Sequence, residues 1–113
     1  MDMNNSRGEK ELQHDISNQE DLVNKIKKNQ SKFEEIAFES NKLFQMLKQA
    51  LEYSPIASTS NVNNIYLINE IDETIHEMNI AINQTENSFN ERLEKETKKY
   101  NQLVDKEDLN KRS

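Results

Sequence analysis

The chain has no cysteine and no tryptophan, and its 113 residues include one glycine and one proline. The lack of cysteine excludes disulfides, thiolate catalysis and cysteine-ligated zinc. Because Gly8 is the only glycine, glycine-rich phosphate loops and the usual nucleophile elbows are excluded as well. A single proline leaves long stretches in which a helix meets no breaker. We therefore expect a helical, non-enzymatic protein that needs no cofactor.

Long apolar runs are also missing, so we expect no membrane insertion. The segment Met1 to Lys10 is polar and lacks the apolar core of a Sec-type signal peptide. We expect a cytoplasmic protein, with export alongside a partner by a non-Sec route left open. The net charge of −6 disfavours binding to nucleic acid and to anionic lipid, because both carry negative charge.

The composition favours long helices that share one narrow seam. Hydrophobic residues make up 33% of the chain and charged residues 32%, which is too polar for a deep globular core. Glu, Lys, Gln and Leu are abundant and have high helix propensity. We expect a single domain that covers residues 1–113.

Two apolar stripes with alternating steps of three and four residues run through the chain. The first consists of Leu12, Ile16, Gln19, Val23, Ile26, Gln30, Phe33, Ala37, Ser40, Phe44, Leu47 and Leu51. The second consists of Ile65, Ile68, Ile71, Ile75, Met78, Ile82, Glu86, Phe89, Leu93, Glu96, Tyr100 and Leu103. This period is typical of helices that pack along a seam.

Polar residues interrupt the two stripes at matching places. If the chain folds back near residue 57, the numbers of facing residues sum to about 115. Gln19 then faces Glu96, and Gln30 faces Thr85 or Glu86. We expect Gln19, Gln30, Glu86 and Glu96 to form polar layers that fix the register. The predicted fold is all-α: an antiparallel, coiled-coil-like two-helix hairpin that completes a bundle with a partner.

The expected boundaries follow from capping and turn residues. Ser6 and Glu9 have capping-box spacing, so the first helix is predicted over about residues 7–53. Pro55 and its Ser- and Asn-rich surroundings predict a turn at about 54–61. The second helix is predicted over about 62–109, and both chain ends are expected to fray.

The half of the hairpin next to the turn has a broader apolar face than the half at the chain ends. We name its extra apolar row the apolar flank, and it consists of Ile36, Leu43, Ala50, Leu67, Ile71 and Met78. A two-helix hairpin alone is marginally stable, because few of its residues lie on the seam. The apolar flank is therefore predicted to bind a partner.

Two Glu-x-x-His motifs, Glu11–His14 and Glu73–His76, have the spacing that di-iron bundles use. The hairpin would place them far apart, and Glu11 and His14 face away from the seam. We therefore expect solvated surface histidines, no metal and no catalytic residue.

The tail Leu93-Glu-Lys-Glu-Thr-Lys-Lys-Tyr, with Asp105-Lys-Glu-Asp-Leu109 after it, resembles the C-terminal segment of small helical proteins that travel with LXG toxins. The layout of the whole chain resembles the Esx-like accessory proteins of Gram-positive type VII secretion. The resemblance implies a targeting chaperone that binds the helical domain of a larger secreted toxin, with a second small helical protein as a further partner.

This chain departs from the Esx pattern at two places. Ser54-Pro55-Ile56 stands where Esx proteins have a Trp-x-Gly turn. Val104 lies four residues after Tyr100, at the position where an export signal would have an acidic residue. The resemblance therefore implies a targeting partner and not the export signal itself. Two alternatives stay open: a self-associating homodimer, which would form a four-helix bundle, and a small immunity or regulatory protein.

Overall fold

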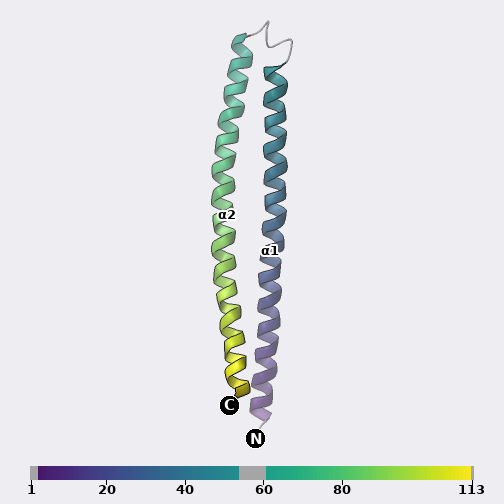
Figure 1. The fold of residues 1–113 in the computed structure, drawn as a ribbon, viewed down its shortest axis with the longest axis vertical. Coiled ribbons are helices and arrows are strands. Elements are labelled where there is room, and N and C mark those ends of the chain that lie inside the picture. The colour runs from purple at the N-terminus through teal and green to yellow at the C-terminus, as the bar shows by residue number, and fades with distance from the viewer. Residues whose placement is uncertain (1–2, 54–60, 113) are drawn as a thin grey trace. The chain divides into compact units, whose positions relative to one another are not determined.

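The structure is a computed structural model that describes residues 3–53 and 61–112, with side chains described for 8–53 and 65–111. It contains two helices, α1 (Met3–Glu52) and α2 (Asn61–Arg112), which pack against each other as an antiparallel hairpin (Figure 1). The described residues include no strand. The predicted all-α hairpin is therefore confirmed, while a bundle completed by a partner stays a prediction.

The helix ends differ somewhat from those expected. α1 begins at Met3, so Ser6 lies inside the helix and not at its first residue. Asn and Ser destabilise a helix by only a few tenths of a kcal/mol relative to better helix formers. A helix that is stabilised by packing further along the chain can therefore extend through Asn4, Asn5 and Ser6. α2 begins at Asn61 and continues to Arg112, beyond the expected end at about 109. Of the predicted turn at about 54–61, residues 54–60, with Pro55, lie outside the described residues.

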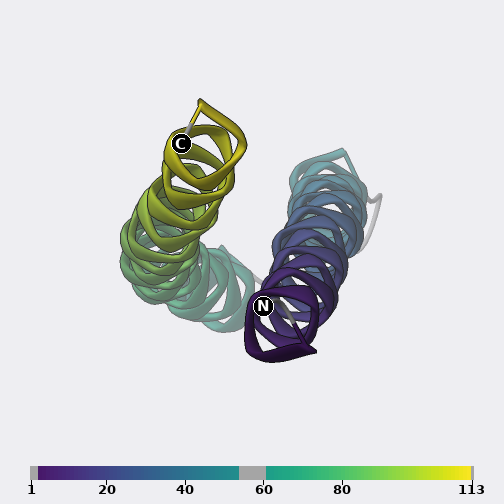
Figure 2. The same ribbon diagram turned by 90° about the horizontal axis from the view of Figure 1, so that it is seen from below.

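The hairpin consists of two compact units, and their common boundary cuts both helices. The first, which we name the terminal unit, comprises Met1–Gln30 and Asn87–Ser113. The second, which we name the turn unit, comprises Ser31–Glu86. The N-terminus of α1 and the C-terminus of α2 both belong to the terminal unit, and these two helix ends lie toward the viewer in Figure 2.

Each unit has its own small core on the predicted seam. Leu12, Val23 and Ile26 are buried in the terminal unit, and Ala37 and Ile75 are buried in the turn unit. All five belong to the two sequence stripes, so the hydrophobic period located the core correctly. Two other stripe residues, Leu47 and Ile65, are exposed, at 49% and 58% of their surface. Leu47 follows buried Ala37 by ten residues, which turns it by about 80° from the seam at 3.6 residues per turn.

Candidate functional site: an apolar flank on the turn unit

Exposed hydrophobic side chains gather in the turn unit. Among the described side chains, large hydrophobic residues are exposed at eleven positions, and only Leu109 lies in the terminal unit. The other ten are Ile36, Phe38, Leu43, Met46, Leu47, Tyr53, Ile65, Tyr66, Leu67 and Ile80. The described hydrophobic side chains of the turn unit are thus more exposed than those of the terminal unit, and the broad apolar face near the turn stays a prediction.

The six residues of the apolar flank are all accessible to some degree. Ile36 and Leu43 are 63% and 65% exposed. Ala50 and Leu67 are exposed as well, whereas Ile71 and Met78 are half-buried. The two half-buried side chains lie closest to the seam, so they can contribute to the hairpin and still offer surface to a partner. Whether a partner binds there stays a prediction.

Handedness places the α1 and α2 members of the apolar flank on the same side of the turn unit. Ile36, Leu43 and Ala50 recur every seven residues, which keeps them in one row beside the seam. Leu67, Thr74 and Ala81 form the corresponding row on α2. At 100° per residue, the α1 row and the α2 row each lie about 80–140° around the helix axis from the buried seam residue of the same helix. The direction of this rotation is the same in both helices when each is viewed from its N-terminus. In an antiparallel pair, equal rotation along each chain leads to the same flank, so the rows border one continuous surface.

Thr74 places one hydroxyl group in the α2 row. Its Oγ1 donates a hydrogen bond of 2.9 Å to the carbonyl oxygen of Glu70, one turn earlier in α2. The hydroxyl hydrogen is thus bound within the helix, and only the acceptor side of the oxygen faces solvent. Leu47, which the sequence placed on the seam, turns toward the same side and enlarges the apolar surface. Sequence reasoning misplaced Leu47 because it followed the heptad step and neglected the drift of a 3.6-residue turn.

The opposite flank of the turn unit carries polar contacts between the helices. Lys48 Nζ lies 2.8 Å from Asp72 Oδ1 on α2 and 4.0 Å from Glu52 Oε1 one turn further along α1. The hydrogen bond with Asp72 raises the pKa of Lys48 above its usual range. The sequence analysis missed this pair, although its charges lie next to the seam. The flank opposite the apolar flank therefore carries an ion pair between the two helices.

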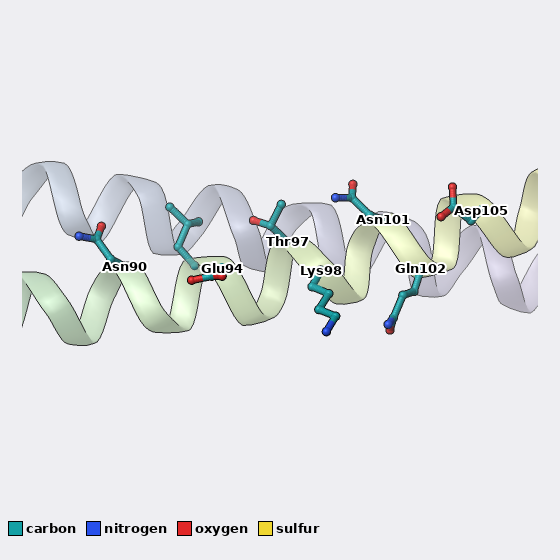
Figure 3. Close-up of a pocket in the computed structure, with 8 residues that line it drawn as sticks. Asn90, Glu94, Thr97, Lys98, Asn101, Gln102 and Asp105 are labelled. Carbon is teal, nitrogen blue, oxygen red and sulfur yellow. The ribbon is translucent and has the colours of Figure 1, made fainter.

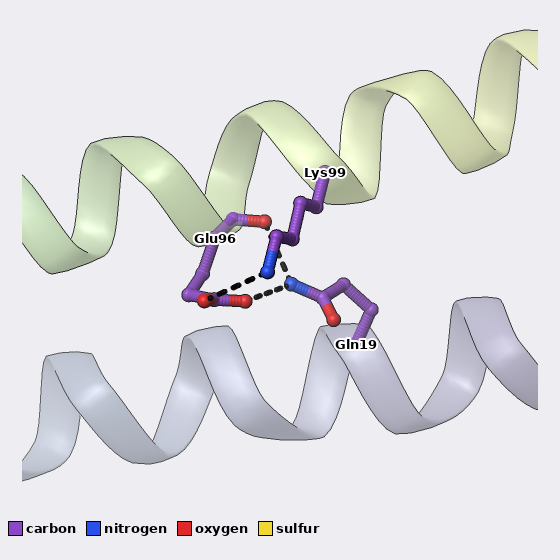
Figure 4. Close-up of polar contacts among 3 residues, drawn as sticks. All are labelled: Gln19, Glu96 and Lys99. Carbon is purple, nitrogen blue, oxygen red and sulfur yellow. Dashed lines mark hydrogen bonds and ion pairs between the residues drawn. The ribbon is translucent and has the colours of Figure 1, made fainter.

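A buried polar layer was predicted between Gln19 and Glu96 in the terminal unit, and this pairing is confirmed. The amide Nε2 of Gln19 donates to Glu96 Oε2 at 2.6 Å and to the Glu96 backbone carbonyl at 2.9 Å (Figure 4). Lys99 Nζ lies 3.5 Å from Glu96 Oε1, and the Glu96 side chain is only 12% exposed. One carboxylate thus receives a neutral donor from α1 and a cation from its own helix. That the pair fixes the register stays a prediction.

The prediction for Gln30 needs correction. Its Nε2 donates to Asn90 Oδ1 at 2.8 Å, about one turn beyond the expected partners. Thr85 and Glu86, the expected partners, belong to the turn unit, whereas Gln30 and Asn90 belong to the terminal unit. Helix side chains lean toward the N-terminus, so a long Gln side chain meets residues of higher number on an antiparallel neighbour. This contact is exposed and is therefore a surface bond, not a buried layer.

The Gln19–Glu96 contact makes the stability of the hairpin depend on pH. The Gln19 hydrogen bond, with the Lys99 charge as a smaller cause, lowers the pKa of Glu96 below its ordinary 4.5. A lowered folded-state pKa means that the ionised carboxylate stabilises the fold above pH 4.5. This stabilisation is lost as the pH falls through the lowered pKa.

We expect Gln19→Ala to raise the pKa of Glu96 toward its ordinary value, because the largest cause of the shift is removed. The carboxyl carbon of Glu96, followed by NMR between pH 6 and pH 2, measures this directly. Gln13→Ala is the matched control, since Gln13 is exposed on the same helix, and it should leave the titration unchanged. An unchanged Glu96 pKa in Gln19→Ala would show that the contact does not form in solution.

Two surface hollows lie among the described residues of the terminal unit. The larger one is open to solvent and is lined by residues of α2 alone, among them Glu94, Lys98 and Asp105 (Figure 3). The smaller one lies between the helix ends and is lined in part by Leu12, Glu107 and Lys111. The pKa of Lys111 is raised by its hydrogen bond with Glu107, at 2.7 Å. The Lys111–Glu107 contact is an ordinary ion pair of an exposed helix surface.

The two Glu-x-x-His motifs lie on exposed helix faces. Glu11 and His14 belong to the terminal unit, and Glu73 and His76 belong to the turn unit. Within the residues that the structure describes, no three His, Asp or Glu side chains are arranged so that they could hold a metal ion. In the same residues, neither helix is long and apolar enough to cross a membrane.

Comparison of the chain with protein-family models, with curated proteins and with solved structures gives no match.

Proposed function

We propose that this chain is a non-enzymatic helical partner that binds the helical domain of a larger secreted protein of the LXG toxin type. In this role it acts as a targeting chaperone for type VII export. It binds the toxin in the cytoplasm, before the toxin is exported by a route other than Sec. The single observation that supports the proposal most is the exposed apolar flank of the turn unit.

The small core supports the same proposal. Of the hydrophobic side chains described, only five are buried, and they are divided between two units. Burial of so few side chains offsets little of the conformational entropy that two helices of 50 and 52 residues lose on folding. A third helix that covers the apolar flank would add buried area where the hairpin lacks it. The C-terminal resemblance to partners of LXG toxins suggests the class of protein that supplies this helix.

The proposal predicts a chain that is poorly stable alone and stable in a complex. We expect a broad thermal transition by circular dichroism for the isolated chain. Co-expression with the helical domain of an LXG toxin encoded beside it should give a complex that unfolds in one sharp transition at a higher temperature.

Light scattering at low micromolar concentration provides the decisive comparison. A mixture that elutes as one heteromeric species supports the proposal. A stable homodimer with a high melting temperature that ignores the toxin domain would overturn it and favour the four-helix bundle.

A further inference from the structure

The net charge of the chain is confined to the unit that carries the apolar flank. The turn unit holds three of the 15 Lys and Arg residues and nine of the 21 Asp and Glu residues, which leaves it with a formal charge of −6. The terminal unit holds twelve of each sign and is formally neutral. Whatever covers the apolar flank therefore approaches the acidic part of the protein.

Three glutamates border the apolar flank, and we name them the acidic rim: Glu39, Glu70 and Glu77. Each of them follows one member of the rows Ile36–Leu43–Ala50 on α1 or Leu67–Thr74–Ala81 on α2 by three residues and precedes the next by four. Glu39 stands in this relation to Ile36 and Leu43, and Glu70 to Leu67 and Thr74. This spacing puts each glutamate one row further from the seam than the apolar residues.

These rim positions are the ones that contact the edges of a third helix. When a helix packs beside two others, its apolar face fills the groove and its flanking side chains lie next to the outer rows. The outer row of α1 contains Lys32, Glu39 and Met46, and that of α2 contains Glu70, Glu77 and Gln84. Acidic side chains thus outnumber the single lysine three to one in these two outer rows.

The charge decides between three classes of occupant. A second copy of this chain would bring another turn unit of charge −6 against the first, and the like charges would repel. An anionic lipid surface is disfavoured for the same reason. A helix with lysine or arginine beside its apolar face complements both the flank and the rim, as basic amphipathic helices do in other acidic, apolar grooves.

We propose that the apolar flank and the acidic rim together bind a basic amphipathic helix of another protein. The apolar face of this helix packs on Leu43, Leu67 and Met78. Its lysine or arginine side chains pair with Glu39, Glu70 and Glu77. The inference rests on the proposed function in one respect, that the occupant is a partner protein, and it adds the chemistry of the binding segment.

Two designed peptides test this chemistry. Each is a helical peptide of about 20 residues, long enough to follow the turn unit for roughly 30 Å, with leucine on its apolar face. One carries lysine at the positions that flank this face, and the other carries glutamate. Fluorescence anisotropy with the full chain should give at least tenfold tighter binding for the lysine peptide, and added salt should reduce the difference.

Matched variants of the chain locate the effect. The triple variant E39Q, E70Q and E77Q should bind the lysine peptide about five- to tenfold more weakly, since three exposed charge pairs are lost. The control variant E34Q, E52Q and D72N changes the charge by the same amount on the opposite flank and should change binding less than twofold. Circular dichroism checks that both variants keep their helix content.

The outcomes separate this inference from the proposed function. Equal affinity for the two peptides, or equal weakening by the two triple variants, overturns the inference. If the toxin domain binds through the apolar flank while the lysine peptide is not preferred, the proposed function survives and the inference fails. If the lysine peptide binds at the acidic rim while no toxin domain binds, the inference survives and the proposed function fails.

Discussion

Replacing Leu43 and Ile71 with aspartate is expected to abolish binding of the partner while the chain stays helical. Each substitution puts a charge where the partner would bury an aliphatic side chain. The lost burial alone is worth about 1.5–3 kcal/mol per residue, so the double variant should bind at least 100-fold more weakly. Titration calorimetry with the partner domain measures the loss, and circular dichroism measures the helix content.

The control for this variant uses residues of the same unit that lie off the apolar flank. Phe38 and Ile80 are 66% and 45% exposed, and Phe38→Asp with Ile80→Asp should leave the affinity within about threefold. Ile71 is half-buried, so its substitution could also weaken the fold. A second variant, Ile36→Asp with Leu43→Asp, changes two exposed residues and therefore separates the effect on binding from an effect on folding. If both flank variants still bind, the assigned binding face is wrong.

Ile26→Ala is expected to have the largest effect on stability. Ile26 is 2% exposed and lies with Val23 in the core of the terminal unit. Truncating a buried isoleucine costs about 2–5 kcal/mol, through lost burial and the cavity that remains. For a hairpin with so small a core this is a large share of the total stability. The urea midpoint at low temperature, followed by circular dichroism, should fall markedly.

Ile36→Ala is the matched control, because it makes the same chemical change at a residue that is 63% exposed. Its effect on the free energy of unfolding should stay within about 0.5 kcal/mol. A similar loss in both variants would mean that the seam of the terminal unit does not hold the hairpin together. The two isoleucines thus test whether burial, and not helix propensity, determines stability.

The candidate site was predictable in outline because its residues follow a fixed period. Ile36, Leu43 and Ala50 recur every seven residues, and any helix places such residues in one row. The same reasoning paired Gln19 with Glu96, since both interrupt their stripes at matching distances from the turn. The predicted partner of Gln30 was wrong, because its amide bonds to Asn90. Pairing residues by number alone takes no account of how long the Gln30 side chain is or that it leans toward the helix N-terminus.

The acidic rim and the Lys48–Asp72 pair were missed for a different reason. Charged residues are abundant on every exposed helix face of this chain, so no single one stands out in the sequence. A signal was present nevertheless: nine acidic residues against three basic ones between Ser31 and Glu86. The charge balance of each half, calculated separately, would have revealed it.

The sequence by itself determined that the chain forms two long helices with one apolar seam, and that the half near the turn has a second apolar row. Helix propensity and hydrophobic period are local properties, so they can be read without a structure. Only the tertiary structure decided which stripe residues are buried, which partner Gln30 binds and how the chain divides into two units. These depend on the distance and rotation between neighbouring helices, which no residue encodes alone.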